Sequence, residues 1–588
     1  MTAIALLAAL LACRALASAG HQLQLSWWSP VAYLWHDAAV VLAFAVFEAV
    51  LRRYPRVVWA AYGIVALYAV ANIPIQRTLW TPLTWTMWRA AGGALSDSIR
   101  HDATWTNAAA MLAGLAAVAM APLACRRVPA RPVLAGVLLC AALGPLAAAR
   151  VDTLGLERNA WTALALPIAP HNGASMAVRD WRAGEAARGS AEDLTRLRGA
   201  LAGRNVVLVS LESTAARYLG IYGAAPDIAP NLTALARSGL VFENAYAVYP
   251  ESIKGLFSIL CSATPGFETN AVSYGGVPCR SAAAVLHDRG YRTALFHSGR
   301  FEYLGMNGVI RNRGYDLLAD AGDIGGRRDS SFGVDEPSTV ARILEWIDAQ
   351  RDRPFFVTYL PIAGHHPYES PEGGPFPDDD EFGRYRNAVH DGDAALGALR
   401  RGLEARGLDR RTAWVVLGDH GEAFGQHPGN YGHTFQLYDE NVRVPFVIAA
   451  PGLFTQPTRV RRVVSLLDTA PTLLDLIGLP IPASYEGASM LDGPARMALF
   501  FTDYSLPLVG LRDGPRKFIH DLRSGRSRMF DVELDPDETI DLSPRYASDA
   551  RRYADALGAW VGFIAARRQE SCGPCPRARA RMPVPPRS

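Results

Sequence analysis

The stretch Thr412-Ala-Trp-Val-Val-Leu-Gly-Asp-His-Gly-Glu422 joins a continuous apolar run to a carboxylate and an imidazole. Its first six residues predict a buried β-strand, and Gly418 ends the run. Asp419 and His420 then emerge together at the carboxyl end of the strand. In a parallel sheet, this is the edge at which α/β domains place their functional groups.

A second run of the same kind lies upstream. Asn205-Val-Val-Leu-Val-Ser-Leu211 predicts another buried strand, and Glu212 follows at its end. Glu212, Asp419 and His420 are therefore candidate ligands of one divalent metal ion. On spacing alone a structural interpretation stays open, with Asp419 as a capping residue and His420 as a hydrogen-bonded core histidine.

Strand-like runs alternate with helical patterns from Asn205 onward. Besides the two strands above, the runs are Arg292–Phe296, Phe355–Leu360 and Phe446–Ala449. This alternation predicts an α/β domain with a largely parallel central sheet, whose active site lies beyond the carboxyl ends of the strands.

Several segments resemble the sulfatase-like branch of the alkaline phosphatase superfamily. They are Pro230-Asn-Leu232 with Gly239–Tyr246, Gly432–Phe446 after the Asp-His pair, Leu467–Asp475 and Phe530–Glu538. They occur in the family's order over roughly Arg204 to Leu542, so the chain is identified as a member of this superfamily. The resemblance implies the fold predicted above and a divalent metal in the site.

Ser252 stands where this family carries its nucleophile, at the expected start of a helix. Setting Ile259-Leu-Cys-Ser262 against a helical segment of the sulfatases gives this alignment. Without the resemblance, Ser252 would be interpreted as an ordinary helix N-cap. Next to a divalent cation, a hydroxyl at a helix amino terminus has the electrostatics to ionise and attack an anionic ester.

The residues after Ser252 bear on the class of chemistry. Ile253-Lys-Gly-Leu256 lacks the proline and arginine of the sulfatase signal for conversion to formylglycine, so Ser252 is expected to remain serine. A plain hydroxyl nucleophile resembles the membrane-bound lipoteichoic acid synthases and phosphoethanolamine transferases, although these use threonine. The Asp-Pro-Asp-Glu538 segment, by contrast, resembles soluble sulfatases.

The resemblance also implies the remaining site. Ser252 completes the metal ligands Glu212, Asp419 and His420, and this mixture of oxygen and nitrogen favours one Mn²⁺ or Zn²⁺, with Mg²⁺ or Ca²⁺ also compatible. His365 and His433 match histidines that bind the substrate phosphate or a second metal, and one of them would assist proton transfer.

Four further side chains are assigned with less support from motifs. His297 matches a headgroup-binding histidine of lipoteichoic acid synthases, but the Trp and Arg that follow it in that pattern are missing here. Lys254 is a candidate for neutralising the transferred phosphate, with a solvated surface lysine as the alternative. His366 is expected to be structural, and the role of His427 is left open.

The first 150 residues hold much of the apolar content of this 588-residue chain, which is 50% hydrophobic. Five stretches are long enough to be considered as membrane spans. They are about Thr2–Ala19, Val31–Leu51, Val57–Ile75, Ala108–Leu123 and Val133–Ala149. A cleaved signal peptide is the alternative for the first.

Loop charge predicts the orientation of these spans. Arg52-Arg-Tyr-Pro-Arg56 follows the second stretch and Arg126-Arg-Val-Pro-Ala-Arg131 follows the fourth. Basic loops stay in the cytoplasm, so everything after Ala149 is expected outside. The expected location is the cytoplasmic (inner) membrane, multi-pass, with an extracytoplasmic catalytic domain.

The expected organisation is a transmembrane domain over 1–150, a linker over 151–203, a catalytic domain over 204–568 and a disordered Arg/Pro-rich tail over 569–588. The net charge of +3 with no basic cluster in the catalytic region gives no reason to expect nucleic-acid binding. An oxidising compartment would permit a disulfide between Cys261 and Cys279. Cys572-Gly-Pro-Cys575 has no context for a redox or metal role.

These observations predict a metal-dependent phosphotransferase that moves phosphoglycerol or phosphoethanolamine from a membrane phospholipid to an envelope glycan or glycolipid through a covalent Ser252 intermediate. Two alternatives stay open. One is a hydrolase of sulfuric or phosphoric esters, and the other is an inactive sulfatase-like binding domain. The sequence leaves the donor headgroup, the acceptor and the oligomeric state undetermined.

Overall fold

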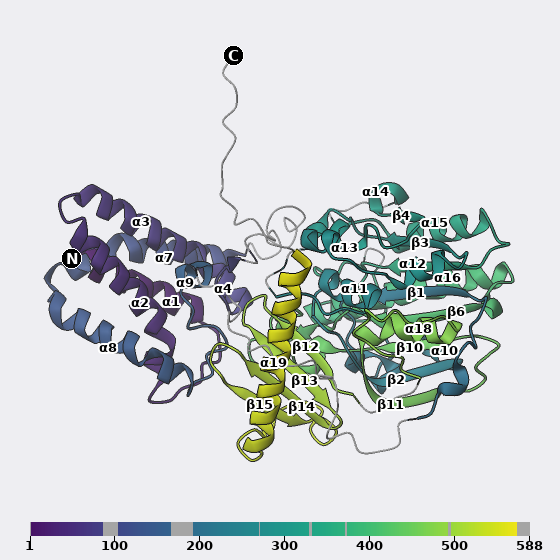
Figure 1. Ribbon diagram of the computed structural model, residues 1–588. Helices are drawn as coiled ribbons and strands as arrows, with labels where there is room; N and C mark the ends of the chain where they lie inside the picture. The colour runs from purple at the N-terminus through teal and green to yellow at the C-terminus, as the bar shows by residue number, and fades with distance from the viewer. Residues whose placement is uncertain are drawn as a thin grey trace.

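The computed structural model describes residues 2–85, 87, 104–165, 192–267, 269, 271–327, 332–370, 373–491 and 496–572. A bundle of helices from the N-terminal region lies at one end of the molecule and an α/β domain at the other (Figure 1). A small antiparallel sheet with a long C-terminal helix lies between them.

The bundle is built from apolar helices. In chain order these are α1 (Thr2–Ser18), α2 (Ser29–Val50), α3 (Pro55–Ala71), α4 (Ile73–Leu79), α7 (Trp105–Ala124) and α8 (Ala130–Ala148), followed by the short α9 (Ala160–Ala165). Within the described residues, four helical stretches are long and apolar enough to cross a membrane. They are Ser29–Val50, Pro55–Leu79, Trp105–Arg127 and Ala130–Ala148.

The prediction of five spans is therefore corrected to four. The first predicted stretch forms α1, but its 17 residues reach only about 26 Å along the helix axis, less than the roughly 30 Å of a hydrocarbon core. Near its end, Arg14 is buried and its Nη2 lies 2.8 Å from Asp37 Oδ2. At its start, the carboxylate of Glu48 accepts hydrogen bonds from the backbone N–H groups of Thr2 and Ala3. Helix α1 thus packs antiparallel to α2 within the bundle.

A nine-stranded, mostly parallel sheet forms the centre of the α/β domain. Its main strands are β1 (Asn205–Leu211), β2 (Gly239–Tyr246), β3 (Arg292–His297), β4 (Leu317–Ala319), β5 (Phe355–Leu360), β6 (Thr412–Gly418), β10 (Phe446–Ala449) and β11 (Thr458–Ser465). The strand order is β11-β2-β10-β6-β1-β5-β3-β4, with β9 (Arg443–Val444) paired to β2. Only β10 runs antiparallel to both of its neighbours in the main path. All five predicted strands are confirmed, because each is a fully buried apolar run.

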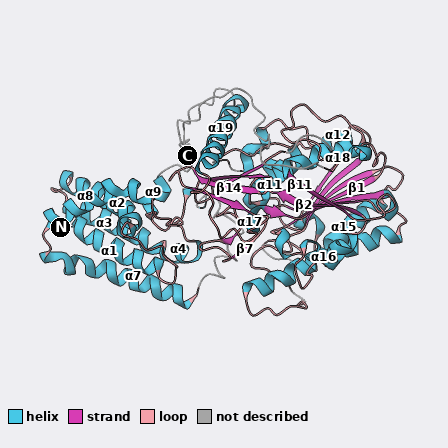
Figure 2. Cartoon of the chain, turned by 90° about the horizontal axis from the view of Figure 1, so that it is seen from below, coloured by secondary structure: helices cyan, strands magenta, loops and turns pink. Residues whose placement is uncertain are grey.

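Helices cover both faces of this sheet, as Figure 2 shows with α12 and α18 on one face and α15 and α16 on the other. One face is packed by α11 (Ser252–Cys261), α12 (Ala282–His287), α13 (Asn307–Ile310) and α18 (Thr469–Ile477). The other is packed by α10 (Pro230–Ala236), α15 (Glu336–Asp348) and α16 (Glu381–Ala405). The result is a three-layer domain, and the predicted α/β class with a largely parallel sheet is confirmed.

The small sheet was not predicted. It consists of β12 (Ala498–Thr502), β13 (Leu508–Asp513), β14 (Arg516–Asp521) and β15 (Ser527–Asp531), paired in that order and all antiparallel. Helix α19 (Ala547–Cys572) packs its apolar side on this sheet. The helix runs beyond residue 568, and residues 573–588, most of the predicted tail and Cys575 included, lie outside the described residues.

The two described ends of the predicted linker pack on different parts of the molecule. Val151 and Leu156 join the apolar cluster at the end of the bundle, whereas Leu194, Leu197 and Leu201 join the core of the α/β domain. Residues 166–191 lie outside the described residues. Cys261, at the end of α11, forms a disulfide with Cys279.

Candidate metal centre and nucleophile

The ends of two neighbouring strands bring the predicted ligands together. β1 and β6 pair in parallel, with Leu211 opposite Gly418. Glu212 and Asp419 follow these residues directly, so the register alone places their backbones side by side at one edge of the sheet. Asp419 Oδ1 accepts hydrogen bonds from the backbone N–H groups of Ser213 (3.1 Å) and His420 (2.7 Å), which fix the carboxylate at the junction of the two strands.

The four predicted ligands converge on a small volume. The Ser252 hydroxyl donates a hydrogen bond to Glu212 Oε2 at 2.8 Å, and its oxygen lies 3.2 Å from His420 Nε2. His420 Nε2 also lies 3.5 Å from Glu212 Oε1 and 3.5 Å from Asp419 Oδ2. Side chains from β1, β6 and α11 therefore point at one position.

The donor set fits a divalent cation. Ligand atoms of Glu212, Asp419 and His420 all lie within 4.8 Å of one another, and all three residues are buried. His420 Nδ1 lies 2.9 Å from the carbonyl oxygen of Gly421, so this nitrogen carries the proton and Nε2 presents a lone pair to the site. A cation at this position would compensate two buried carboxylates.

The pKa values of the two carboxyl groups are shifted in opposite directions. Burial alone would raise the pKa of Glu212, but the charges of His420, His365 and His433 and the hydrogen bond from Ser252 lower it to about 2. Burial and the charge of Glu212 raise the pKa of Asp419 well above its usual range. The raised pKa of Asp419 is the effect expected when a carboxyl group is held beside a second, ionised carboxylate.

Helix α11 positions the candidate nucleophile. Its N-cap is Glu251, whose carboxylate accepts hydrogen bonds from the backbone N–H groups of Ile253 and Lys254. Ser252 is thus the first residue of the helix, and the interpretation of Ser252 as an N-cap is wrong. Its hydroxyl is left to face the metal ligands at the positive end of the helix dipole.

Three of the predicted histidines surround Glu212. His365 and His433 lie close enough to lower its pKa, and Glu212 in turn acts on His297. The ring of His433 stacks on that of His420 with 4.1 Å between centroids. His297 is buried, and its Nδ1 lies 3.0 Å from the carbonyl oxygen of Leu360.

Glu422 is a site residue that the sequence argument missed. One oxygen lies 2.8 Å from His433 Nδ1, and the other accepts a hydrogen bond of 2.8 Å from the hydroxyl of Tyr368. With His420 and His433 it forms a second group of possible ligands. Burial raises the pKa of its carboxyl to about 7. Glu422 ends the stretch quoted first, two residues beyond His420, and that spacing was the available signal.

Lys254 is buried rather than solvated. Its Nζ lies 3.0 Å from Asp503 Oδ1 and 4.1 Å from the ring centroid of Tyr249, whose hydroxyl donates to the same carboxylate at 2.7 Å. The surface-lysine alternative is therefore wrong. Asp503 follows β12 in the small sheet and was also missed.

The two other histidines lie in different surroundings. His366 packs its ring edge-on to Tyr368, with 5.3 Å between centroids. His427, whose role was left open, is buried with Nδ1 2.6 Å from Glu440 Oε1 and its ring stacked on Tyr438. These contacts give His427 a structural role.

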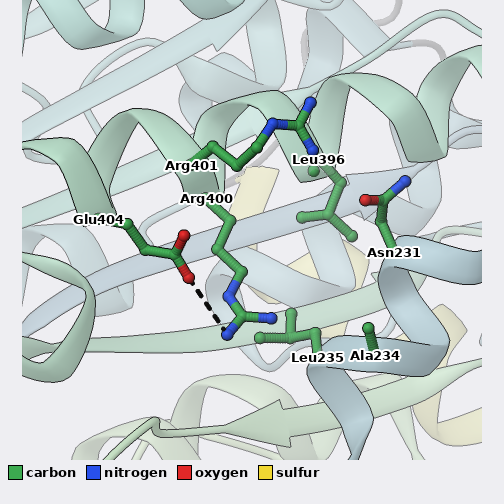
Figure 3. A pocket seen from close by; sticks show the side chains of 8 residues that line it. Asn231, Ala234, Leu235, Leu396, Arg400, Arg401 and Glu404 are labelled. Atoms are coloured by element: carbon green, nitrogen blue, oxygen red, sulfur yellow. Dashed lines mark ion pairs between the residues drawn. The ribbon is translucent and has the colours of Figure 1, made fainter.

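A separate cavity of about 160 Å³ lies between α10 and α16, away from the ligand cluster. Figure 3 shows the side chains that line it, including Asn231, Arg400 and Glu404, with the ion pair between Arg400 and Glu404 dashed. None of the predicted site residues lines it. The candidate metal ligands lie instead at the carboxyl ends of β1 and β6.

Comparison with known proteins agrees with this geometry. Residues 204–479 match the family model named Sulfatase. The candidate ligands Glu212, Asp419 and His420 and the candidate nucleophile Ser252 all lie inside this segment, which is similar to the Sulfatase family.

The similar curated proteins include both sulfatases and a synthase-like protein. Arylsulfatase K of Bos taurus is 30% identical over 175 residues, which cover 26% of this chain and 32% of that protein. An arylsulfatase of Clostridium perfringens is 24% identical over 436 residues, covering 58% and 90%. The lipoteichoic acid synthase-like protein YvgJ of Bacillus subtilis is 24% identical over 315 residues, covering 50% and 51%. The chain spans only about a third of the length of the arylsulfatase K sequences.

Solved structures show the same fold. The lipoteichoic acid synthase LtaP from Listeria monocytogenes matches with a TM-score of 0.54 and 21% identity, over 64% of this chain and 95% of that one. An alkaline phosphatase superfamily protein from Vibrio parahaemolyticus matches with a TM-score of 0.52 and 21% identity, over 66% and 90%.

Proposed function

We propose that this chain, which carries a Sulfatase-family domain at residues 204–479, is a membrane-bound, metal-dependent phosphotransferase. It would move the headgroup phosphate of a phospholipid, as phosphoglycerol or phosphoethanolamine, to a hydroxyl of an envelope glycan or glycolipid. The observation that carries this proposal is the position of the Ser252 hydroxyl, 2.8 Å from Glu212 and 3.2 Å from His420 at the start of α11.

The residues that follow Ser252 support transfer rather than sulfatase chemistry. Ile253, Lys254 and Gly255 replace the proline- and arginine-containing signal that sulfatases use to convert their nucleophile. A serine that stays a serine offers a hydroxyl able to form a stable phosphate ester. That ester is the intermediate a transferase needs.

The proposed reaction has two balanced halves. Ser252 Oγ forms a bond to phosphorus as the bond from phosphorus to the diacylglycerol oxygen breaks, and the hydroxyl proton is relayed to that departing oxygen. In the second half the acceptor hydroxyl attacks phosphorus, the bond to Ser252 Oγ breaks, and the acceptor proton returns to the serine. Glu212, Asp419, His420 and Ser252 would hold the divalent ion, whose charge would stabilise the ionised hydroxyl and the reacting phosphate.

Histidines around Glu212 are suited to the proton relay. His433 is oriented by Glu422, and the Nδ1 of His365 lies 2.6 Å from the carbonyl oxygen of His366. Each ring therefore has its other nitrogen free for a proton on the substrate side. Lys254 and His297 would contribute to binding of the phosphate and its headgroup.

Membrane attachment supports a lipid donor. Among the residues that the structure describes, four helices are long and apolar enough to span a bilayer. The basic loop after α2 and the basic loop after α7 are expected on the cytoplasmic side, which would leave the Sulfatase-family domain outside the inner membrane. An active site on that side of the membrane would be accessible to the phospholipid headgroups of the outer leaflet.

A second candidate is hydrolysis of sulfate or phosphate esters by the same site. The similarity to arylsulfatases of Clostridium perfringens and Bos taurus favours it. An inactive binding domain is disfavoured, because Glu212, Asp419, His420 and Ser252 are all present and face one another.

The test is release of diacylglycerol by the purified full chain in mixed phospholipid and detergent micelles. Ser252→Ala is expected to lower the rate about a thousandfold or more, and chelation of the metal to do the same. Ser258→Ala, a buried serine on the same helix that faces the core, is the matched control and should keep the activity. Hydrolysis of an aryl sulfate without release of diacylglycerol would replace the proposal by the hydrolase.

A further inference from the structure

The end of the helical bundle is connected to the small sheet by polar contacts. The carboxylate of Asp152, just after α8, pairs with Arg526 at 2.8 Å and with Arg528, both on the β14–β15 hairpin. The Thr84 hydroxyl donates to the carbonyl oxygen of Tyr504 at 3.1 Å. This junction is therefore built from the bundle, the segment after α8, and loops of the catalytic half.

Arg158 lies at the centre of the junction and is completely buried. Its Nη1 donates to the carbonyl oxygen of Ser505 (2.6 Å) and to Thr81 Oγ1 (3.2 Å). Its Nε and Nη2 have no hydrogen-bond partner among the described residues. These two atoms form the edge of a guanidinium that binds the two oxygens of a carboxylate or phosphate side-on.

Further unpartnered nitrogens lie in the same region. Arg523 Nη2, Arg526 Nη1 and His36 Nε2 are buried and lack partners within the described part of the chain. Arg158 and Arg523 are close enough that burial and the charge of Arg523 lower the pKa of Arg158 to about 9. His36, from α2, is within electrostatic reach of both arginines.

The nearby carboxylates are engaged elsewhere. Glu157 accepts a short hydrogen bond from Thr153, and Asp521 accepts from Ser524 Oγ at 2.6 Å and from the backbone N–H of Arg523 at 2.9 Å. Asp152 is taken by the hairpin arginines. The charges of Glu157 and Asp521 offset part of the repulsion between the buried Arg158 and the half-buried Arg523, but neither carboxylate is hydrogen-bonded to Arg158. An oxyanion would stabilise this pair of guanidinium groups.

We propose that Arg158 and Arg523, with His36, form a second binding site that takes the phosphate group of an anionic phospholipid headgroup, separate from the metal centre. Phosphate oxygens match both the free Nε–Nη2 edge of Arg158 and the positive charge of its neighbours. Arg523 is only half-buried on the hairpin turn, so the site reaches the surface at the end of the bundle. The assignment of the ligand to a lipid rests on the proposed membrane function. The binding of an anion is inferred from the arginine side chains and does not rest on that function.

A ligand here would act on the catalytic site through one loop. Ser505 and Tyr504, which contact Arg158 and Thr84, directly follow Asp503. Asp503 is the ion-pair partner of Lys254, two residues after Ser252. An occupied site would therefore hold the loop that positions Lys254.

The test measures the thermal unfolding midpoint of the full chain in detergent, after chelation of metal and in the Ser252→Ala background. These conditions remove the nucleophile and the metal, and the comparison with Arg523→Gln separates binding at the junction from binding that remains at the metal centre. The probes are phosphatidylglycerol, phosphatidylcholine and inorganic phosphate, each added separately. A ligand that binds only the folded protein raises the midpoint. The unfolding midpoint is expected to rise with phosphatidylglycerol and to change little with phosphatidylcholine.

Arg523→Gln is the main variant. The side chain of Arg523 has no hydrogen-bond partner among the described residues, so this substitution is not expected to unfold the protein. It should weaken binding of phosphatidylglycerol about tenfold. Arg158→Lys should weaken it similarly, since lysine lacks the two-point edge, and Arg401→Gln, an exposed arginine on α16, should not.

The outcomes separate the two sources of phosphate. A rise with phosphatidylglycerol alone, lost in Arg523→Gln, supports a lipid site. An equal rise with inorganic phosphate supports the anion site and overturns its assignment to a lipid. No rise with any probe, or a rise that Arg523→Gln retains, overturns the site. Because Ser252 and the metal are absent in every arm, none of these results depends on the transferase proposal.

Discussion

At the scale of single residues, Lys254 combines a structural contact with the proposed role in binding the substrate phosphate. The lysine is buried two positions after Ser252 and is held by Asp503 and the ring of Tyr249. Removing it would leave a buried carboxylate without its cation, which costs about 3–5 kcal/mol of unfolding free energy.

A double substitution separates the two roles. Lys254→Met is expected to lose both stability and transfer activity, while Lys254→Met with Asp503→Asn should regain most of the stability, because no uncompensated charge remains. If Lys254 binds the transferred phosphate, the activity per folded molecule stays low in both the single and the double variant. The measurements are urea unfolding and diacylglycerol release.

Lys517 provides the matched control. It is also fully buried and pairs with Asp439 and Glu538, each at 2.8 Å, but it belongs to β14. Lys517→Met should lower stability while folded molecules keep their activity. Full recovery of activity in the Lys254–Asp503 double variant would contradict a role in substrate binding.

The site residues that could be predicted are those whose position depends on local sequence. Glu212, Asp419 and His420 follow buried apolar runs, so the strand ends alone bring them together. Glu251 and Asp503 were missed, because a residue before a helix and a residue after an unpredicted strand give no local signal. The contact of Asp503 with Lys254 arises from packing between distant segments.

At the scale of elements, His427 joins the β7–β8 hairpin to α17. β7 (Ala423–Phe424) and β8 (Tyr431–Gly432) flank it, and α17 (Asp439–Val442) carries Glu440. His427 Nδ1 lies 2.6 Å from Glu440 Oε1, and Asn430 donates to the same oxygen at 2.9 Å. The pair holds the loop that leads to His433.

This pair predicts a pH dependence of stability. Burial would lower the pKa of His427, but the hydrogen bond and charge of Glu440 raise it above the ordinary 6.5. Burial would raise the pKa of Glu440, but the hydrogen bond and charge of His427 lower it below the ordinary 4.5. The histidine's contribution is complete below pH 6.5 and is lost as pH rises through its raised pKa. The carboxylate's contribution is complete above pH 4.5 and is lost as pH falls through its lowered pKa.

The pair therefore stabilises most between about pH 4.5 and 6.5. His427→Gln should cost about 1–3 kcal/mol in that window and progressively less at higher pH. Urea unfolding at a series of pH values measures this. A loss that stays constant from pH 5 to pH 9 would show that the charge of His427 does not contribute.

The strands that could be predicted from the sequence are those whose residues are completely buried. β1, β3, β5, β6 and β10 are short, fully buried apolar runs, and each was predicted close to its observed limits. β14 and β15 mix charged and apolar residues, as in Arg516-Lys-Phe-Ile-His-Asp521. Their stability comes from pairing with each other and packing under α19, which periodicity does not reveal.

At the scale of the whole molecule, the proposed orientation in the membrane rests on the four longer helices found among the described residues. The loops after α2 and after α7 carry the arginine clusters Arg52–Arg56 and Arg126–Arg131. Two spans separate these loops, so both lie on one side, and α8 carries the chain to the other. The catalytic domain is thus expected outside whether or not α1 also spans.

Cysteine labelling in intact cells tests this orientation. With the five cysteines outside the disulfide replaced by serine, Arg461→Cys on the α/β domain, where the side chain is 83% exposed, should react with an impermeant maleimide. Arg53→Cys, in the exposed loop after α2, should react only after permeabilisation. The reverse pattern would contradict the proposed location.

The most direct test of the account is mass spectrometry of the peptide that contains Ser252, after incubation of the full chain with metal and mixed membrane phospholipids. The account predicts a phosphoglycerol or phosphoethanolamine adduct on Ser252, present in the wild-type chain and in Ser258→Ala. Loss of two hydrogens from Ser252, which marks formylglycine, would contradict it and identify a sulfatase.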